Sequence, residues 1–293
     1  SMSESVIADF VGKFNAETSA HGEPTPGRIV LSQKRLVLAA DGDHRLTIPL
    51  SDIFDVAVGH VPPDLGNFFD STVTIAFERS GDRYVAAVEA GDDKIEKFST
   101  VLFKAICNGT EMTVKPPARR GGRVTDEPFF PARLSLRPRA VCFRNDSRTV
   151  EIDLSHVTKF DRTTREIGER RRPVLEVRHM VDGEALTTLA ATTSARKMSI
   201  IGRYLRIEYS DLVGELSDID LTTDKTELLV ALYSGAGVQG VSLADVLDME
   251  ASQVTMLLNT LEEEGLVVDG ADGTELTPKG QVVVSNHLED VNT

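Results

Sequence analysis

The sequence is poor in the groups that form disulfide bonds and metal sites. It has only two cysteines, Cys107 and Cys142, each among apolar neighbours and without a C-x-x-C spacing. This pattern is typical of buried free thiols in a reducing cytoplasm. The 6 histidines are scattered, and no two of them lie at a metal-ligand spacing. We therefore predict no zinc site.

Long hydrophobic runs are also missing. No stretch of about 18 apolar residues occurs, so we expect no membrane-spanning helix. The N-terminal residues lack the basic segment and apolar block of a secretory signal, and we expect a cytoplasmic protein. Hydrophobic residues make up 41% of the 293 residues, which is enough for folded cores and fits two or three domains.

The motifs of enzymes are absent too. There is no glycine-rich phosphate loop and no G-x-S-x-G. The acidic pairs Asp41/Asp43 and Asp269/Asp272 are typical of hairpin turns rather than calcium sites. Ser155 and His156 are neighbours in an expected strand, so their side chains would point to opposite faces. We predict no enzyme and no cofactor.

Charge is distributed unevenly along the chain. The net charge is −14, with 22 arginines against 10 lysines, which suits a high-salt cytoplasm but also occurs in ordinary acidic proteins. Residues 217–293 carry a net −13, whereas residues 115–178 carry a net +7. We therefore expect a basic middle and a strongly acidic C-terminal part, which favours partners of contrasting charge.

One pattern occurs twice. RLTIPLSDI at 45–53 aligns with TVEIDLSHV at 149–157, and the strand-like blocks before each copy align in the same order. After each set of alternating strands the apolar spacing becomes helical, over 91–109 and again over 194–212. A repeat that preserves order, turns and period predicts the same architecture twice: an antiparallel sheet closed by a C-terminal helix.

This order resembles the pleckstrin-homology-like (PH-like) superfold, and GRIVLSQKRLVLA with IPLSDI is similar to its GRAM-type version. We predict a first PH-like domain at 1–112 and a second at 128–214. Pro116-Pro117 and Gly121-Gly122 indicate a linker over 113–127.

The C-terminal part, 217–293, has a different pattern. Three helical segments, a hairpin and a last helix opened by Thr277-Pro278 predict a winged helix-turn-helix, and LEEEGLV followed by LTPKG is typical of that family. Leu257 and Leu261 would face its core. The complete chain is therefore expected to be an α+β multidomain protein.

A winged helix suggests DNA binding, but the acidic charge of this domain argues against it. Residues 226–278 contain no lysine and no arginine, although such side chains supply most non-specific affinity for DNA. We expect no DNA binding, and we expect a protein partner at the helix that carries Met256 and Asn259.

A cluster of arginines in the second sheet domain is the other candidate: Arg162, Arg165, Arg170, Arg171 and Arg172. We expect it on a loop. Three interpretations stay open: a solvated loop neutralised by Glu166 and Glu169, a docking patch for an acidic protein, or a lipid phosphate site. The corresponding first-domain loop, ETSAHGEPTPG, has no lysine or arginine, which argues against a lipid role there.

From end to end the chain resembles the CheF family of archaeal taxis proteins. The segments SVIADFVGKF, GRIVLSQKRLVLA, IPLSDIFDV and LTPKG carry the resemblance. It implies an adaptor in chemotaxis and phototaxis that receives phosphorylated CheY and signals to motor-associated proteins of the archaellum, in a network with CheC- and CheD-type proteins. It assigns no contact residues, and a homodimer is compatible with it. The rival classes are a winged-helix transcription regulator and a PH-like protein docked on a membrane.

Overall fold

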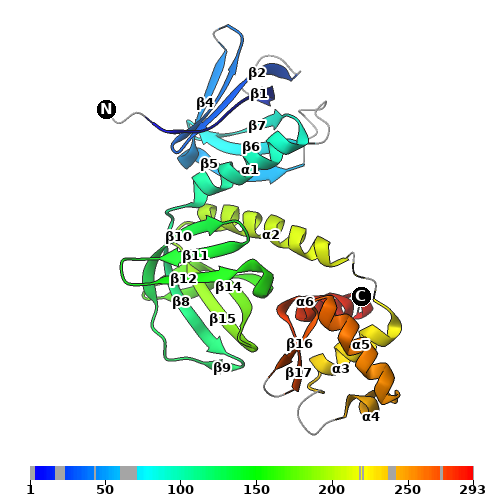
Figure 1. The fold of residues 1–293 in the computed structure, drawn as a ribbon. Helices are drawn as coiled ribbons and strands as arrows, with labels where there is room; N and C mark the ends of the chain where they lie inside the picture. Colours follow the sequence, from blue (N-terminus) through cyan, green and yellow to red (C-terminus); the bar gives the residue numbers. More distant parts are fainter. Residues whose placement is uncertain are drawn as a thin grey trace.

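The computed structural model is an α+β protein with two antiparallel sheet domains and a mainly helical third domain (Figure 1). This confirms the expected fold class at that level. The structure describes the following residues: 4–16, 24–42, 44–59, 71–217, 219, 221–236, 242–270 and 273–292. Asp43 and Asp272, of the two predicted acidic turns, and part of ETSAHGEPTPG lie outside the described residues.

The first sheet has the strand order β4-β3-β2-β1-β7-β6-β5, and its pairings are antiparallel. Its strands are β1 (Val6–Ala16), β2 (Thr25–Ser32), β3 (Arg35–Ala40), β4 (Arg45–Pro49), β5 (Ile53–Val58), β6 (Thr72–Arg79) and β7 (Asp82–Glu89). A 3-10 turn, η1 (Leu50–Asp52), joins β4 to β5, and helix α1 (Asp92–Cys107) follows β7. The alternation that predicted these strands buries one face, as Leu36 and Leu38 of β3 show.

The second sheet repeats this arrangement strand for strand, in the order β12-β11-β10-β8-β15-β14-β13, with β9 paired to β8 beside this path. Its strands are β8 (Glu111–Arg120), β9 (Arg123–Val124), β10 (Phe130–Arg137), β11 (Ala140–Arg144), β12 (Thr149–Asp153), β13 (Val157–Ile167), β14 (Arg170–Val181) and β15 (Glu184–Ala191). The turn η3 (Leu154–His156) and the closing helix α2 (Ala195–Ser217) correspond to η1 and α1. The repeated segments 45–53 and 149–157 therefore occupy equivalent places, as the repeat predicts.

The predicted linker over 113–127 is wrong. Strand β8 occupies Glu111–Arg120 and takes the central place that β1 has in the first sheet, so the second domain begins near residue 111. Strand β8 pairs with β10 through Glu111–Val114 and with β15 through Thr113–Lys115 and Arg119–Arg120. The register shifts between these two β15 segments, and Pro116-Pro117 lies at that irregularity. A proline without an N–H is tolerated there.

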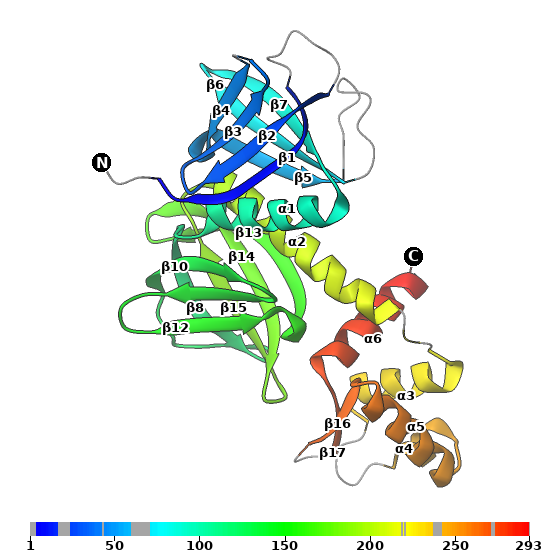
Figure 2. The ribbon, with the colours of Figure 1, turned by 45° about the horizontal axis from the view of Figure 1, so that its top comes forward.

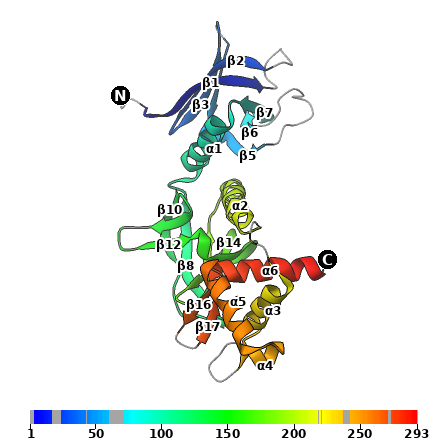
Figure 3. The same ribbon diagram turned by 45° about the vertical axis from the view of Figure 1, so that its right-hand side comes forward.

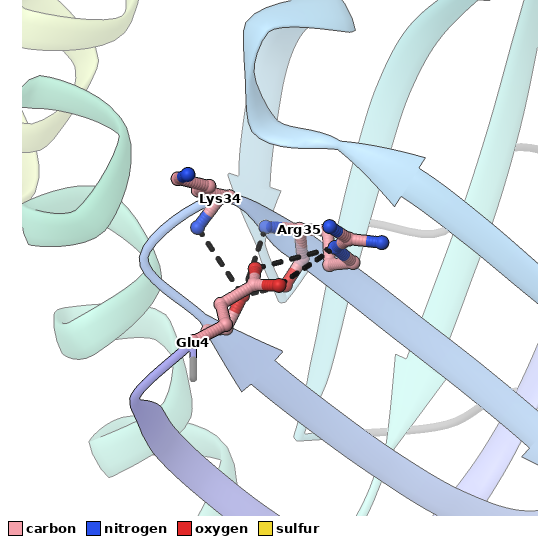
Figure 4. A network of polar contacts seen from close by, with 4 residues as sticks. Glu4, Lys34 and Arg35 are labelled. Atoms are coloured by element: carbon pink, nitrogen blue, oxygen red, sulfur yellow. Dashed lines mark hydrogen bonds and ion pairs between the residues drawn. The ribbon is translucent and has the colours of Figure 1, made fainter. Parts of the chain in front are cut away.

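Glu4 is bound to the turn between β2 and β3 (Figure 4). The Glu4 carboxylate accepts a hydrogen bond from the Ser32 hydroxyl and lies 3.1 Å from Nε of Arg35. The pKa of Glu4 lies below its ordinary value, mainly because of the hydrogen bond from Ser32 and secondly because of Arg35. These contacts hold Glu4, just before β1, against the first sheet.

The two sheet domains share one hydrophobic core. A continuous cluster of buried side chains runs from Phe14 in β1 to Leu205 in α2. Helices α1 and α2 lie side by side between the sheets (Figure 2), and the rings of Phe103 and Tyr204 are 5.5 Å apart across this junction. Tyr204 is only 2% exposed. The two halves are therefore packed as a single unit, which we call the sheet unit.

The third domain has its own core, built around Leu228, Leu229 and Leu261. Its elements follow the predicted order: α3 (Thr223–Tyr233), α4 (Leu243–Leu247), α5 (Ala251–Glu263), β16 (Val267–Gly270), β17 (Gly273–Leu276) and α6 (Pro278–Asn292). Thr277 caps α6, because its hydroxyl accepts a hydrogen bond from the Gly280 N–H at 3.1 Å. Helix α6 carries the contacts to the sheet unit, at β13, η3 and α2.

Candidate interaction surfaces

The arginine cluster lies on a hairpin of two strands, and the prediction of a loop is wrong. Arg162 and Arg165 belong to β13, and Arg170–Arg172 begin β14. Arg165 pairs with Arg172, and Glu166 with Arg171, in the antiparallel register, so that only Gly168 and Glu169 form the turn. The backbone ladder continues through the charged run because pairing depends on the backbone and on side-chain alternation, not on polarity alone.

The five arginines do not form one surface. The Arg165 guanidinium lies 3.2 Å from Glu176, and Arg172 donates a hydrogen bond to the Thr113 hydroxyl at 3.1 Å. Arg162 turns toward α2 and donates to the Ser199 hydroxyl at 3.2 Å. Arg170 and Arg171 are exposed and make no ion pair among the described residues. They are the members of the cluster that can contact a partner most freely.

Met256 and Asn259 share the exposed face of α5. Met256 is 71% exposed, and Asn259 is exposed one helical turn later. Leu261 is fully buried as predicted, whereas Leu257 is only half-buried against the same core, so the prediction of two equivalent core residues is only partly correct. The exposed side of α5 is available for contact.

Both lysines of the third domain point toward Glu264 at the end of α5. Nζ of Lys225 is 2.6 Å from the Glu264 carboxylate, and Nζ of Lys279 donates to the Glu264 carbonyl at 3.1 Å. The side chain of Lys225 is only 14% exposed. Both lysines therefore make contacts within the domain rather than extend from its surface. The surface that remains is acidic, and it would repel a nucleic acid.

A cleft of about 1200 Å³ separates the second sheet domain from the third domain. Figure 3 shows α6 beside the second sheet and below α2. One wall comes from β8, β13, β14 and α2, and it includes five basic side chains: Arg119, Lys159, Arg162, Arg178 and Arg206. The other wall comes from α3 and α6 and includes Tyr233, Gln281 and Asn286. Of the predicted site residues only Arg162 lies here.

Comparison with known proteins places the chain in a family. The family described as "Archaeal Chemotaxis signal transduction system protein F" matches residues 6–211. "Taxis protein CheF2" of Halobacterium salinarum is 48% identical over 291 residues, which cover 99% of this chain and 100% of that protein. The chain belongs to the CheF family.

A second CheF relative is more distant. "Taxis protein CheF1" of Halobacterium salinarum is 30% identical over 303 residues, covering 99% of each chain. A match to a solved structure titled "Crystal structure of the C-terminal domain of an unknown protein from Leishmania infantum" covers 35% of this chain and 85% of that chain, at 10% identity and a TM-score of 0.27. CheF membership assigns the chain to archaeal chemotaxis signal transduction.

The described part of this CheF chain shows no cluster of metal-ligating side chains. No group of three or more histidine, cysteine, aspartate or glutamate side chains there is placed to hold a metal ion. Ser155 and His156 lie in the 3-10 turn η3, not in a strand as predicted, and the Ser155 hydroxyl donates to Asp153 at 2.6 Å. The family name is likewise that of a signalling protein.

Two cysteines and one histidine are buried titratable groups of this CheF chain. Cys107 and Cys142 are free and buried, as predicted, and burial raises the pKa of Cys107 to about 12. His179 of β14 is 7% exposed, and its Nε2 lies 2.8 Å from the Thr188 hydroxyl. Burial lowers the pKa of His179 to about 4. No helix in the described ranges combines the length and the apolar character that crossing a membrane requires.

Proposed function

We propose that this CheF chain is a non-enzymatic adaptor of the cytoplasm that binds phosphorylated CheY and motor-associated proteins of the archaellum. It thereby controls rotational switching in chemotaxis and phototaxis. CheC- and CheD-type proteins are further candidate partners in this network. The observation that carries the proposal is the division of the chain into a sheet unit with one shared core and a third domain with a separate core. Two units with separate cores offer separate faces to separate partners.

We further propose that the two sheet domains are PH-like and that the third domain is a winged helix used for protein contacts. Seven strands in one order, followed by a closing helix, support the first assignment in both halves. The order of helices and hairpin supports the second. The inward position of Lys225 and Lys279 supports a protein partner over DNA.

Two surfaces are assigned to partners in this proposal. The first is the tip of the β13–β14 hairpin, where Arg170 and Arg171 are exposed, and it suits an acidic protein. The second is the exposed face of α5 with Met256 and Asn259, where an adaptable thioether suits a protein contact. Arg165 and Arg172 act within the sheet rather than at the interface.

The test is isothermal calorimetry of the purified chain with CheY, phosphorylated and unphosphorylated, and separately with each archaellum motor-associated protein. We expect tighter binding of phosphorylated than of unphosphorylated CheY, and binding of at least one motor-side protein. A Met256→Asp variant should bind one partner more weakly and bind the others with unchanged affinity. The proposal is wrong if phosphorylation changes nothing, if no motor-side protein binds, or if duplex DNA binds with sub-micromolar affinity in physiological salt.

A further inference from the structure

The basic wall of the cleft carries positive charge that no carboxylate among the described residues neutralises. Arg119 of β8, Arg178 of β14 and Arg206 of α2 are exposed and make no ion pair among the described residues. Three elements that are far apart in sequence bring these three guanidinium groups to one wall. A guanidinium is the side chain best suited to bind carboxylates or phosphates through two parallel hydrogen bonds.

The carboxylates on the same wall already have partners. Asp161 lies 3.5 Å from Nζ of Lys159, and Glu176 lies 3.2 Å from Arg165. The described third-domain residues that line the opposite wall are uncharged, and its polar side chains are those of Tyr233, Gln281, Ser285 and Asn286. The cleft therefore combines unbalanced positive charge on one side with hydrogen-bonding amides and hydroxyls on the other.

From this geometry we infer that the cleft is a docking groove for an acidic segment of a partner protein, which contacts the sheet unit and the third domain together. The inference rests on the adaptor function proposed above and names a site for one of its partners. A volume of about 1200 Å³ exceeds the usual range for small-molecule pockets and suits a short peptide segment. A nucleic acid fits less well, because residues 217–293 next to the groove carry a net −13.

Occupation of the groove would also fix the third domain. The hydrophobic clusters of the sheet unit and of the third domain are separate, and the two units meet through α6, so no shared core locks their relative orientation. A segment that contacts Arg178 and Arg206 on one wall and Asn286 on the other binds best to one orientation. Binding therefore shifts the population toward that orientation.

The probe is a fluorescein-labelled peptide of ten residues that alternates aspartate and glycine, measured by fluorescence anisotropy with the full chain. The test variant is Arg178→Glu/Arg206→Glu, and Arg178→Gln/Arg206→Gln keeps the test valid if charge reversal impairs folding. The matched control is Arg45→Glu/Arg144→Glu, which makes the same charge change at two exposed arginines of β4 and β11, outside both the cleft and the hairpin tip. We expect at least a tenfold loss of affinity in both test variants and less than a threefold loss in the control.

The peptide affinities of the unmodified chain and the variants are compared in 0.15 M and in 1 M salt. At 1 M the Debye length falls to about 3 Å, and only direct contacts persist. An equal loss in the test variants and the control, no binding by the unmodified chain, or tighter binding of a single-stranded oligonucleotide than of the peptide would overturn the inference. Binding of phosphorylated CheY and of motor proteins is measured on the same variants. Unchanged binding of all of them would refute the groove as their site while leaving the adaptor function intact.

Discussion

Arg203 of α2 donates a hydrogen bond of 3.0 Å from its Nη2 to the Asp55 carboxylate of β5. The closing helix of the second sheet domain thus contacts an outer strand of the first. Arg196, two turns earlier on α2, forms an ion pair with Glu78 and lies over the ring of Phe54. Helix α2 completes one domain and binds the other.

The first prediction separates the polar from the apolar part of this junction. Arg203 and Asp55 are 41% and 37% exposed, so Arg203→Ala should cost less than about 1 kcal/mol. Tyr204→Ala removes a buried ring next to Phe103 and should cost about 3–5 kcal/mol. Urea unfolding followed by circular dichroism measures both variants. Equal losses would contradict this prediction and show that the ion pair contributes as much to the junction as the aromatic contact.

The second prediction concerns two leucines of α5. Leu261 is fully buried, so Leu261→Ala should lower the free energy of unfolding of the third domain by about 2–5 kcal/mol. Leu257 is half-buried, and Leu257→Ala should cost clearly less because fewer contacts are lost. Thermal unfolding compares the two variants. A larger loss for Leu257→Ala would mean that α5 is rotated about its axis relative to this structure.

The third prediction is a dependence of stability on pH. The pKa of His179 is about 4 in the folded chain against an ordinary value of 6.5, mainly because of burial. Folding therefore favours the neutral form of His179. Its contribution to the free energy of unfolding is complete above pH 6.5 and is lost as the pH falls toward 4. At about 1.4 kcal/mol per pH unit the total loss is about 3 kcal/mol.

The measurement for His179 is the free energy of unfolding between pH 7 and pH 4. His179→Gln should remove most of the decrease in that window. His156→Gln, at a side chain that is 51% exposed, should keep most of it. The assignment to His179 fails if both variants show the same pH dependence as the unmodified chain.

The fourth prediction concerns the arginine hairpin. Arg170→Ala/Arg171→Ala should change the free energy of unfolding by no more than about 0.5 kcal/mol, because both side chains are exposed. The same variant should bind phosphorylated CheY or a motor-side protein more weakly, as calorimetry would report. Arg172→Ala should instead destabilise the chain, because it removes the hydrogen bond to Thr113. Unchanged affinity for every partner would leave the hairpin tip as a solvated turn.

Much of the sheet unit could be predicted because strand alternation and repeat order are local signals. The equivalent places of the segments 45–53 and 149–157 follow from their alignment, but the 3-10 turns η1 and η3 within them do not, because the alternation there favours a continuous strand. The linker prediction failed at Pro116-Pro117, where residues that usually end a strand sit at a change of register. The loop prediction failed at Arg170–Arg172, because consecutive charged residues show no alternation of apolar and polar side chains. The hairpin turn there is only two residues long.

The candidate surfaces were less predictable, since they depend on tertiary placement. The exposed position of Met256 follows from helical spacing within one segment. The groove does not, because Arg119, Arg178 and Arg206 come from three elements, and Arg206 lies outside the basic region recognised in the sequence. The net +7 of residues 115–178 indicated the right part of the chain, but not which of its arginines are left without a partner.

The shared core has a consequence for cooperativity. Since one buried cluster extends from Phe14 to Leu205, neither sheet domain can lose its packing without exposing apolar surface of the other. The two repeats should therefore melt in a single calorimetric transition, although each has the strand count of a complete domain. The third domain should melt separately. In thermodynamic terms, the two repeats are then one folding unit.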